Sequence, residues 1–233
     1  MRYLALASDY DGTLTTEGRV ADEILSALKR LKESGRKLIL VTGRQLDDLC
    51  QVFSQIDEFD CVVAENGALL FWPATREEQL LGDRPPTKSF IQGLEARQVK
   101  PLSVGRVIVA TWEPNETKVL ETIQELGLEL QIIFNKGAVM VLPSGINKAT
   151  GLKAALHRMS LAPDHVVAVG DAENDHAFLD LCGFSVAVAN ALPRVKEQVN
   201  WVTQNSRGAG VAELIDKLIA SDLKSLTVTA TDC

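Results

Sequence analysis

The chain has 233 residues, of which 46% are hydrophobic, enough to bury the core of one large domain or of two smaller ones. A formal net charge of −7 without a long basic run argues against a nucleic acid or an anionic membrane as partner. The apolar run at the amino terminus ends at Asp9, too early for a signal peptide or a membrane span. The four cysteines form no Cys-x-x-Cys pair, so we expect reduced thiols and a cytoplasmic protein.

The first part of the chain alternates short apolar runs with segments of helical periodicity. Buried strands are predicted at 3–7, 37–41 and 61–64, and apolar side chains at helical spacing predict helices at 20–31 and 46–53. Strands that alternate with helices indicate an α/β fold with a parallel sheet. Ligands of such sheets bind at the carboxyl ends of the strands.

The pattern changes in the middle of the chain. Residues 81–86 are rich in glycine, proline and charge, which is typical of a linker. Beyond a short strand at 68–73 and this linker, helices are expected at 87–98 and 115–126, and strands at 104–112, 131–134 and 138–142. We therefore predict a small α+β domain over 83–146, inserted between the two parts of a larger domain at 1–82 and 147–220.

The first pattern returns after residue 147. The predicted elements are a helix at 152–159, a buried strand at 166–169, a short helix at 178–181, strands at 184–189 and 201–203, and, after Gly208-Ala-Gly210, a last helix at 211–218. The polar segment 221–233 is expected to be a loose tail.

Two aspartates end the first strand. Asp9 and Asp11 are two positions apart, so their side chains leave a strand on the same side. Like charges this close repel unless a cation lies between them. Gly12 allows a sharp turn directly afterwards. Taken alone, the pattern is also that of an ordinary polar strand end.

Further polar residues stand at strand ends or helix starts of the same predicted sheet. Thr42 follows the second strand, Lys148 opens a helix, and Asp171 and Asp175 flank a turn. Carboxylates are preferred ligands of Mg²⁺, while a threonine hydroxyl, helix N–H groups and a lysine suit a phosphate. Each position also has an ordinary explanation as a cap, a turn or a solvated residue. Their joint placement predicts phosphoryl transfer through an aspartyl-phosphate.

Four segments resemble, in order, the four motifs of the haloacid dehalogenase (HAD) superfamily. They are Ser8-Asp-Tyr-Asp-Gly-Thr-Leu-Thr15, Leu40-Val-Thr-Gly-Arg44, Asn147-Lys-Ala-Thr-Gly-Leu152 and Gly170-Asp-Ala-Glu-Asn-Asp175. The resemblance implies a Rossmann-like parallel-sheet core. An insert between the second and third motifs resembles the C2-type cap of the Cof-like branch. That branch also includes sucrose-phosphate, mannosyl-phosphoglycerate and phosphoglycolate phosphatases.

The resemblance implies roles for the acidic residues. Asp9 would be the nucleophile, and Asp11 would protonate the leaving oxygen and then activate the hydrolytic water. Mg²⁺ would be held by Asp9, by the backbone carbonyl of Asp11 and by Asp171, with Asp175 in or next to that shell.

The remaining motif residues would bind the substrate. Thr42, Gly43 and Lys148 would contact the phosphoryl oxygens. Asn174 would orient the acidic cluster. Arg44 would contact the substrate or the cap, or lie on a helix surface.

These roles predict a Mg²⁺-dependent phosphatase that hydrolyses a small soluble phosphate monoester. An alternative is a phosphotransferase of the phosphomannomutase type. A remote one is a receiver-like signalling module, although the third strand ends in Glu65-Asn-Gly67 without an acceptor aspartate. The expected partner is a small phosphorylated metabolite, and the oligomeric state is open. The candidate cap contacts, which the sequence does not rank, are Arg84, Lys88, Arg97, Arg106, Trp112 and Lys136.

Overall fold

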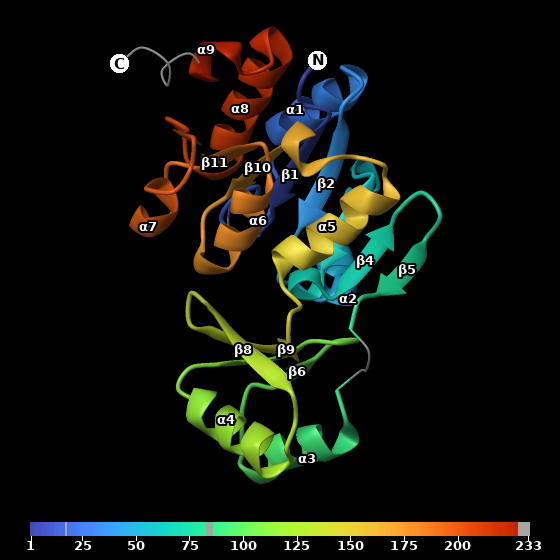
Figure 1. Cartoon of the computed structure of the whole chain (residues 1–233), viewed down its shortest axis with the longest axis vertical. Helices are drawn as coiled ribbons and strands as arrows, with labels where there is room; N and C mark the ends of the chain where they lie inside the picture. Colours follow the sequence, from blue (N-terminus) through green and yellow to red (C-terminus); the bar gives the residue numbers. More distant parts are fainter. Residues whose placement is uncertain (17, 83–85, 228–233) are drawn as a thin grey trace.

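The computed structural model describes residues 1–16, 18–82 and 86–227 (Figure 1). Its larger sheet contains β1 (Ala5–Asp9), β2 (Lys37–Val41), β3 (Cys61–Ala64), β4 (Leu69–Trp72), β5 (Glu77–Leu80), β10 (Val166–Gly170), β11 (Phe184–Ala187) and β12 (Trp201–Val202). The strand order is β12-β11-β10-β1-β2-β3-β4-β5. The strands from β12 to β3 are parallel, and β4 and β5 extend this sheet as an antiparallel hairpin.

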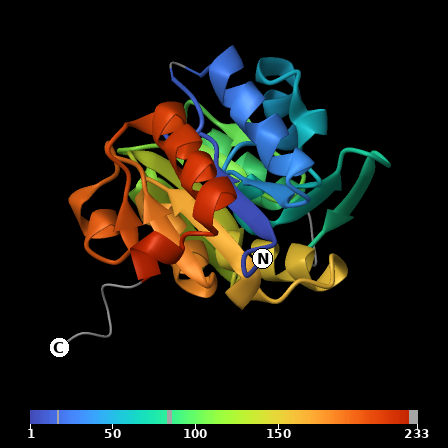
Figure 2. The ribbon, with the colours of Figure 1, turned by 90° about the horizontal axis from the view of Figure 1, so that it is seen from above.

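Helices cover both faces of this sheet, so its central strands are apolar along their length. The helices of this part are α1 (Asp22–Glu33), α2 (Leu46–Val52), α5 (Lys148–Arg158), α6 (His176–Leu181), α7 (Pro193–Lys196), α8 (Arg207–Ser221) and α9 (Lys224–Thr227). Short 3₁₀ turns occur at 56–58, 65–67, 163–165 and 173–175. Figure 2 shows α1 and α8 side by side on one face and α5 on the other. On α1, Ile24, Leu28 and Leu31 point into the core at helical spacing.

A second, four-stranded sheet forms the smaller part of the molecule. It contains β6 (Ser103–Val104), β7 (Val109–Trp112), β8 (Leu130–Asn135) and β9 (Ala138–Pro143), all antiparallel in the order β6-β7-β9-β8. The helices α3 (Lys88–Ala96) and α4 (Glu116–Glu125) pack on one face of it. The other face is turned towards the larger sheet (Figure 1). Val139 and Val141 point to the helices and Met140 to the opposite face, as strand alternation requires.

The observed architecture confirms the predicted fold class, an α/β parallel-sheet core with a small α+β unit. All elements from α3 to β9 fall within 83–146, the predicted insert. The strand expected at 104–112 is confirmed only in its second half, as β7, because residues 105–108 leave the ladder and separate β6 from β7. Strand β5 was not predicted, because its Glu77–Leu80 segment is exposed throughout and lacks apolar alternation.

The prediction of a loose tail from residue 221 is wrong for the described part of that segment. Helix α8 ends at Ser221, Leu223 is fully buried, and α9 follows. The side chain of Asp222 accepts hydrogen bonds from the backbone N–H groups of Arg2 and Tyr3 and from Arg36. These contacts fasten the end of α8 to the start of β1. Residues 228–233 lie outside the described part of the chain.

No helix in the described ranges combines the length and apolar character needed to cross a bilayer. Cys50, Cys61 and Cys182 are free thiols, and Cys233 lies outside the described residues. Burial raises the pKa of the Cys61 and Cys182 thiols to about 12. These two thiols are therefore protonated at neutral pH and behave as small apolar groups.

Asp222 provides a test of this terminal contact. Burial alone would raise its pKa, but the hydrogen bonds from Arg2, Arg36 and Tyr3 lower it below the usual value. A lowered pKa stabilises the fold above the unfolded pKa, and this contribution is lost as the pH falls through the folded pKa. Asp222→Asn should lower the free energy of unfolding by about 1–3 kcal/mol at pH 7 in urea denaturation. The difference from the wild type should shrink below about pH 4.

Asp216→Asn is the matched control, because Asp216 forms an exposed pair with Arg30. Such pairs contribute about 0–1 kcal/mol. Equal losses in the two variants, or a loss at Asp222 that does not change with pH, would contradict this account.

Candidate active site

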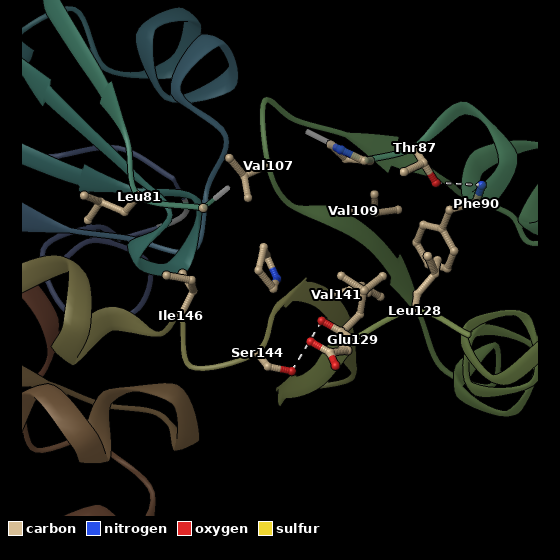
Figure 3. Close-up of a pocket in the computed structure, with 14 residues that line it drawn as sticks. Leu81, Thr87, Phe90, Val107, Val109, Leu128, Glu129, Val141, Ser144 and Ile146 are labelled. Atoms are coloured by element: carbon tan, nitrogen blue, oxygen red, sulfur yellow. Dashed lines mark hydrogen bonds between the residues drawn. The ribbon is translucent and has the colours of Figure 1, made fainter. Parts of the chain in front are cut away.

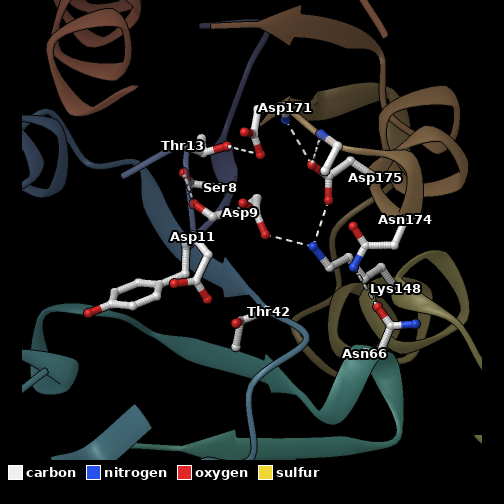
Figure 4. Close-up of polar contacts among 12 residues, drawn as sticks. Ser8, Asp9, Asp11, Thr13, Thr42, Asn66, Lys148, Asp171, Asn174 and Asp175 are labelled. Atoms are coloured by element: carbon white, nitrogen blue, oxygen red, sulfur yellow. Dashed lines mark hydrogen bonds and ion pairs between the residues drawn. The ribbon is translucent and has the colours of Figure 1, made fainter. Parts of the chain in front are cut away.

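The motif residues meet at the carboxyl ends of three neighbouring strands. Asp9 is the last residue of β1, Thr42 follows β2, and Asp171 follows β10. Because β1 pairs with β2 and with β10 in parallel, these ends lie at one edge of the sheet. Lys148, the first residue of α5, reaches the same edge from the side (Figure 4).

Lys148 links two buried carboxylates. Its Nζ is 2.6 Å from Asp9 Oδ1 and 2.6 Å from Asp175 Oδ1. The exposed fractions of the three residues are 4% for Asp9, 1% for Lys148 and 0% for Asp175, so water does not screen these charges. No other hydrogen bond to the carboxylate of Asp9 occurs among the described residues, which leaves its Oδ2 without a protein donor.

The site carries more negative charge than the lysine balances. Burial raises the pKa of Asp9 to about 8, and repulsion by Asp175 adds to the effect. Burial would lower the pKa of Lys148, but Asp175 and Asp9 together raise it. The lysine is therefore charged, and a further cation at this place would stabilise the ionised form of Asp9.

Asp175 builds the turn that carries Asp171. Its Oδ2 accepts hydrogen bonds from the backbone N–H of Asp171 at 2.8 Å and of Ala172 at 3.0 Å. The Asp171 carboxylate in turn accepts a hydrogen bond from Thr13 at 3.4 Å. Gly12 (φ +85°) passes so close to this carboxylate that any side chain there would collide with it. Asp175 thus sets the position of Asp171, and Gly12 leaves it room.

Three of the predicted metal ligands form a compact oxygen cluster. Asp9, Asp171 and Asp175 are buried, and one carboxylate oxygen of each lies within 4.8 Å of the others. The carboxylate of Asp11 is not part of this cluster. Two ammonium groups contact the cluster. Lys148 binds Asp9, and Lys136 Nζ lies 2.5 Å from Asp171 Oδ2. The donor atoms are hard oxygens, which suits Mg²⁺.

Arg44 is tied to Asp11 and is not a free surface arginine. Its Nε and one terminal nitrogen donate to the two Asp11 oxygens at 2.7 and 2.9 Å, and Asp48 binds the other nitrogen at 2.6 Å. The hydrogen bonds that Arg44 donates to Asp11 raise the pKa of Arg44, although burial opposes this. The bidentate contact holds the Asp11 side chain at the mouth of the site.

Thr42 is fully buried beneath this pair. Its hydroxyl accepts a hydrogen bond from the Arg44 N–H at 3.1 Å, and its carbonyl accepts one from the Asn66 N–H at 3.0 Å. Gly43, which has no side chain, lines the cavity above the site instead. The loop after β2 therefore presents Gly43 to the cavity, whereas the side chain of Thr42, a predicted phosphate ligand, is buried and is not among the residues that line it.

Two asparagines lie beside the acidic cluster. Asn174 Nδ2 donates to Asn66 Oδ1 at 3.0 Å (Figure 4). Asn174 Oδ1 and Asn66 Nδ2 are buried and have no hydrogen-bond partner. Since buried amide atoms are normally satisfied, the pair has hydrogen-bonding capacity left at the edge of the cavity. Asn66, in the 3₁₀ turn 65–67 that follows β3, was not predicted as a site residue from the sequence.

Glu65 is the second residue that the sequence analysis missed. It is fully buried, and its carboxylate accepts three backbone hydrogen bonds from the small unit, from Arg106, Val107 and Ile108 at 2.8–3.0 Å. A side chain at Gly105 would come within 2.8 Å of this carboxylate. Glu65 therefore fastens the loop between β6 and β7 to the edge of the larger sheet. Its only sequence signal is its place directly after a buried strand.

A cavity of about 550 Å³ lies between the larger sheet and the smaller one. Its floor contains Asp9, Asp11 and Lys148. Of the six candidate cap contacts, Trp112 and Lys136 line it. Three others do not, namely Lys88 on the exposed surface of α3, Arg97, which binds Glu125, and Arg106, which binds Asp47 and Glu78. Arg84 lies outside the described residues.

A second cavity of about 480 Å³ lies at the junction of the two units (Figure 3). Its walls are mainly apolar and include Leu81, Phe90, Val107 and Val141. No motif residue is among the described residues that line it. The acidic cavity is therefore the one where chemistry is expected.

Comparisons with known proteins agree with this geometry. The haloacid dehalogenase-like hydrolase family matches residues 6–105 and 98–215. The phosphoglycolate phosphatase of Methanothermobacter thermautotrophicus is 32% identical over 223 residues, covering 92% of this chain and 98% of that protein. The phosphoglycolate phosphatase of Haloarcula marismortui is 34% identical over 222 residues, covering 90% and 95%. A haloacid dehalogenase-like hydrolase structure from Bacteroides thetaiotaomicron aligns with a TM-score of 0.79 at 19% identity, covering 93% and 99%.

The parallel sheet and its buried acidic edge thus define a hydrolase of the phosphoryl-transfer type. The chain belongs to the haloacid dehalogenase-like hydrolases and is a phosphatase of that superfamily. The family and the enzyme class predicted from the four motifs are confirmed.

The contact of Glu65 with the small unit can be tested on its own. Glu65→Gln keeps the shape but turns an amide NH₂ towards backbone N–H donors, which leaves at least one of them unsatisfied. The variant should lose about 1–3 kcal/mol of unfolding free energy. Amide hydrogen exchange of residues 105–108 should accelerate. The control is Glu95→Gln on the exposed surface of α3, and exchange at 105–108 as slow as in the wild type would contradict the role of Glu65.

Proposed function

We propose that the protein is a Mg²⁺-dependent phosphatase that hydrolyses a small soluble phosphate monoester through an aspartyl-phosphate on Asp9. The observation that carries this proposal is the buried Asp9 carboxylate, bound on one oxygen by Lys148 and open on the other, at the floor of a capped cavity. The free thiols and the acidic charge support a cytoplasmic enzyme that acts on a metabolite.

The residues present fit a magnesium ion. Three buried carboxylates share one place, and their charge exceeds that of Lys148. Asp9, Asp171 and the backbone carbonyl of Asp11 would hold the ion. Asp175 supports this set, because its oxygens already accept from Lys148 and two backbone N–H groups. When bound, Mg²⁺ supplies positive charge that offsets the carboxylates and the phosphoryl oxygens.

The chain's own residues supply nucleophile and charge for the first step. Asp9 Oδ2 attacks phosphorus while Lys148 keeps the carboxylate in place and offsets phosphoryl charge. The Gly43 N–H and the Thr42 hydroxyl bind phosphoryl oxygens. The bond from phosphorus to the ester oxygen breaks, and this oxygen takes its proton from Asp11.

In the second step, Asp11 takes a proton from water, and the resulting hydroxide attacks phosphorus and releases phosphate from Asp9. Both oxygens of Asp11 accept hydrogen bonds from Arg44, so Asp11 has to leave Arg44 before it carries a proton to the ester oxygen.

We further propose that the substrate is phosphoglycolate or a similarly small phosphorylated acid. The similarity to the phosphoglycolate phosphatases of Methanothermobacter thermautotrophicus and Haloarcula marismortui supports this choice. The cavity of about 550 Å³ has room for a small phosphorylated acid.

Asp9→Asn should reduce phosphate release from phosphoglycolate with Mg²⁺ by at least about 10³-fold, because the amide is not a nucleophile. Asp180→Asn, an exposed position on α6, should retain wild-type turnover. Thermal unfolding of both variants checks that they are folded. Turnover by Asp9→Asn near the wild-type rate would refute the assignment of the nucleophile.

Removal of divalent cations should abolish turnover, and Mg²⁺ should restore it. Because Mg²⁺ would bind only the folded acidic cluster, a concentration of 100 times its dissociation constant should add about 2.7 kcal/mol of stability. Calorimetric titration and thermal unfolding with and without EDTA measure this. Full activity in EDTA would argue against a metal.

The phosphotransferase alternative differs in the fate of the phosphoryl group. With glucose or mannose phosphates present, ³¹P NMR should show inorganic phosphate as the only new product. Accumulation of an isomeric sugar phosphate would favour a mutase instead.

A further inference from the structure

Lys136 lies at the tip of the β8–β9 hairpin and reaches into the acidic site. Its Nζ is 2.5 Å from Asp171 Oδ2, and its side chain remains 45% exposed. The hairpin contacts the 3₁₀ turn 173–175, and Lys136 lines the same cavity as Asp9. This lysine thus belongs to the small unit but points at the catalytic edge of the larger sheet.

The backbone of Lys136 is in an unusual conformation for a lysine. Lys136 (φ +48°) and Gly137 (φ +84°) form the centre of the turn, positions at which asparagine and glycine are favoured. A left-handed lysine costs about 1 kcal/mol relative to glycine. Lys136 is therefore unfavourable for the backbone of this turn, so its presence there is better explained by the contact of its side chain with Asp171.

Among the described residues, Lys136 is the cation that the small unit contributes to this cavity. The two cations from the larger unit each have two carboxylate partners, Asp11 and Asp48 for Arg44, and Asp9 and Asp175 for Lys148. Lys136 has Asp171, which the proposed function assigns to Mg²⁺. Because two cations on one carboxylate repel, Lys136 needs another anion once the metal binds.

We propose that Lys136 selects substrates whose leaving group carries a carboxylate, and that it exchanges Asp171 for that carboxylate. This inference rests on the proposed function. Lys148 and Gly43 line the cavity from the larger sheet, where the proposed function places the phosphoryl group, so a cation from the small unit on the opposite wall would face the leaving group. Its neighbours Trp112 and Met140 are uncharged, and Lys136 is thus the residue there that distinguishes an acid from a neutral ester.

The test compares two esters of equal length, phosphoglycolate and 2-hydroxyethyl phosphate. Lys136→Met removes the charge and keeps the chain length, and Lys136→Arg keeps the charge. In Lys136→Met, the ratio of kcat/KM for phosphoglycolate to that for 2-hydroxyethyl phosphate should fall about 10- to 100-fold. Lys136→Arg should keep more of the ratio than Lys136→Met. The control Lys88→Met on α3 should show the wild-type ratio, and a wild-type ratio in Lys136→Met would overturn the proposal.

Metal binding gives a readout that does not depend on turnover. Without substrate, Lys136→Met should bind Mg²⁺ more tightly than the wild type in calorimetric titration, because no ammonium competes for Asp171. Unchanged Mg²⁺ affinity would overturn the exchange of partners.

Equilibrium binding separates this proposal from the proposed function. If the wild type hydrolyses neither ester, the proposed function fails. Tighter binding of phosphoglycolate than of 2-hydroxyethyl phosphate with Mg²⁺, lost in Lys136→Met, would still support Lys136 as the selecting residue. Equal binding of the two esters by the wild type would refute it.

Discussion

The structure depends on one ammonium group buried between two carboxylates. Lys148 Nζ joins Asp9 to Asp175, and Asp175 in turn forms the turn that positions Asp171. Removing one member of such a buried network leaves an uncompensated charge, which costs more than the loss of a surface pair. Four motif residues from β1, α5 and the segment after β10 therefore form one electrostatic unit. Its surplus of negative charge is what makes a divalent cation a fitting further component.

A second set of contacts connects this unit to the smaller sheet. Glu65 accepts three backbone hydrogen bonds from residues 106–108, and Lys136 reaches back to Asp171. The contact of Glu65 is buried, and its carboxylate accepts hydrogen bonds at both oxygens, whereas the side chain of Lys136 is half exposed. The small unit is thus held by a buried set of hydrogen bonds at one point and by a half-exposed ion pair at another.

The sequence predicted the site residues better than their partners. Apolar runs that stop at Asp9, Thr42 and Asp171 place these residues at strand ends, and parallel strands bring such ends together. The pairing of Arg44 with Asp11 was not predictable, because surface exposure and pairing give an arginine the same local pattern. Glu65 was missed for a related reason. A glutamate is almost never fully buried unless it is paired, and its donors are backbone groups about 40 residues away, which carry no sequence signal.

The sequence by itself determined the fold class, the family and the order of the motifs, because these follow from local periodicity and from short segments of defined chemistry. Only the tertiary structure decided which charges meet. It broke the strand expected at 104–112 so that its backbone could bind Glu65, and it fixed the segment after α8 through Asp222. It also brought Lys136 to Asp171. Such contacts join residues far apart in the chain, and their free energy depends on burial and distance that no local pattern encodes.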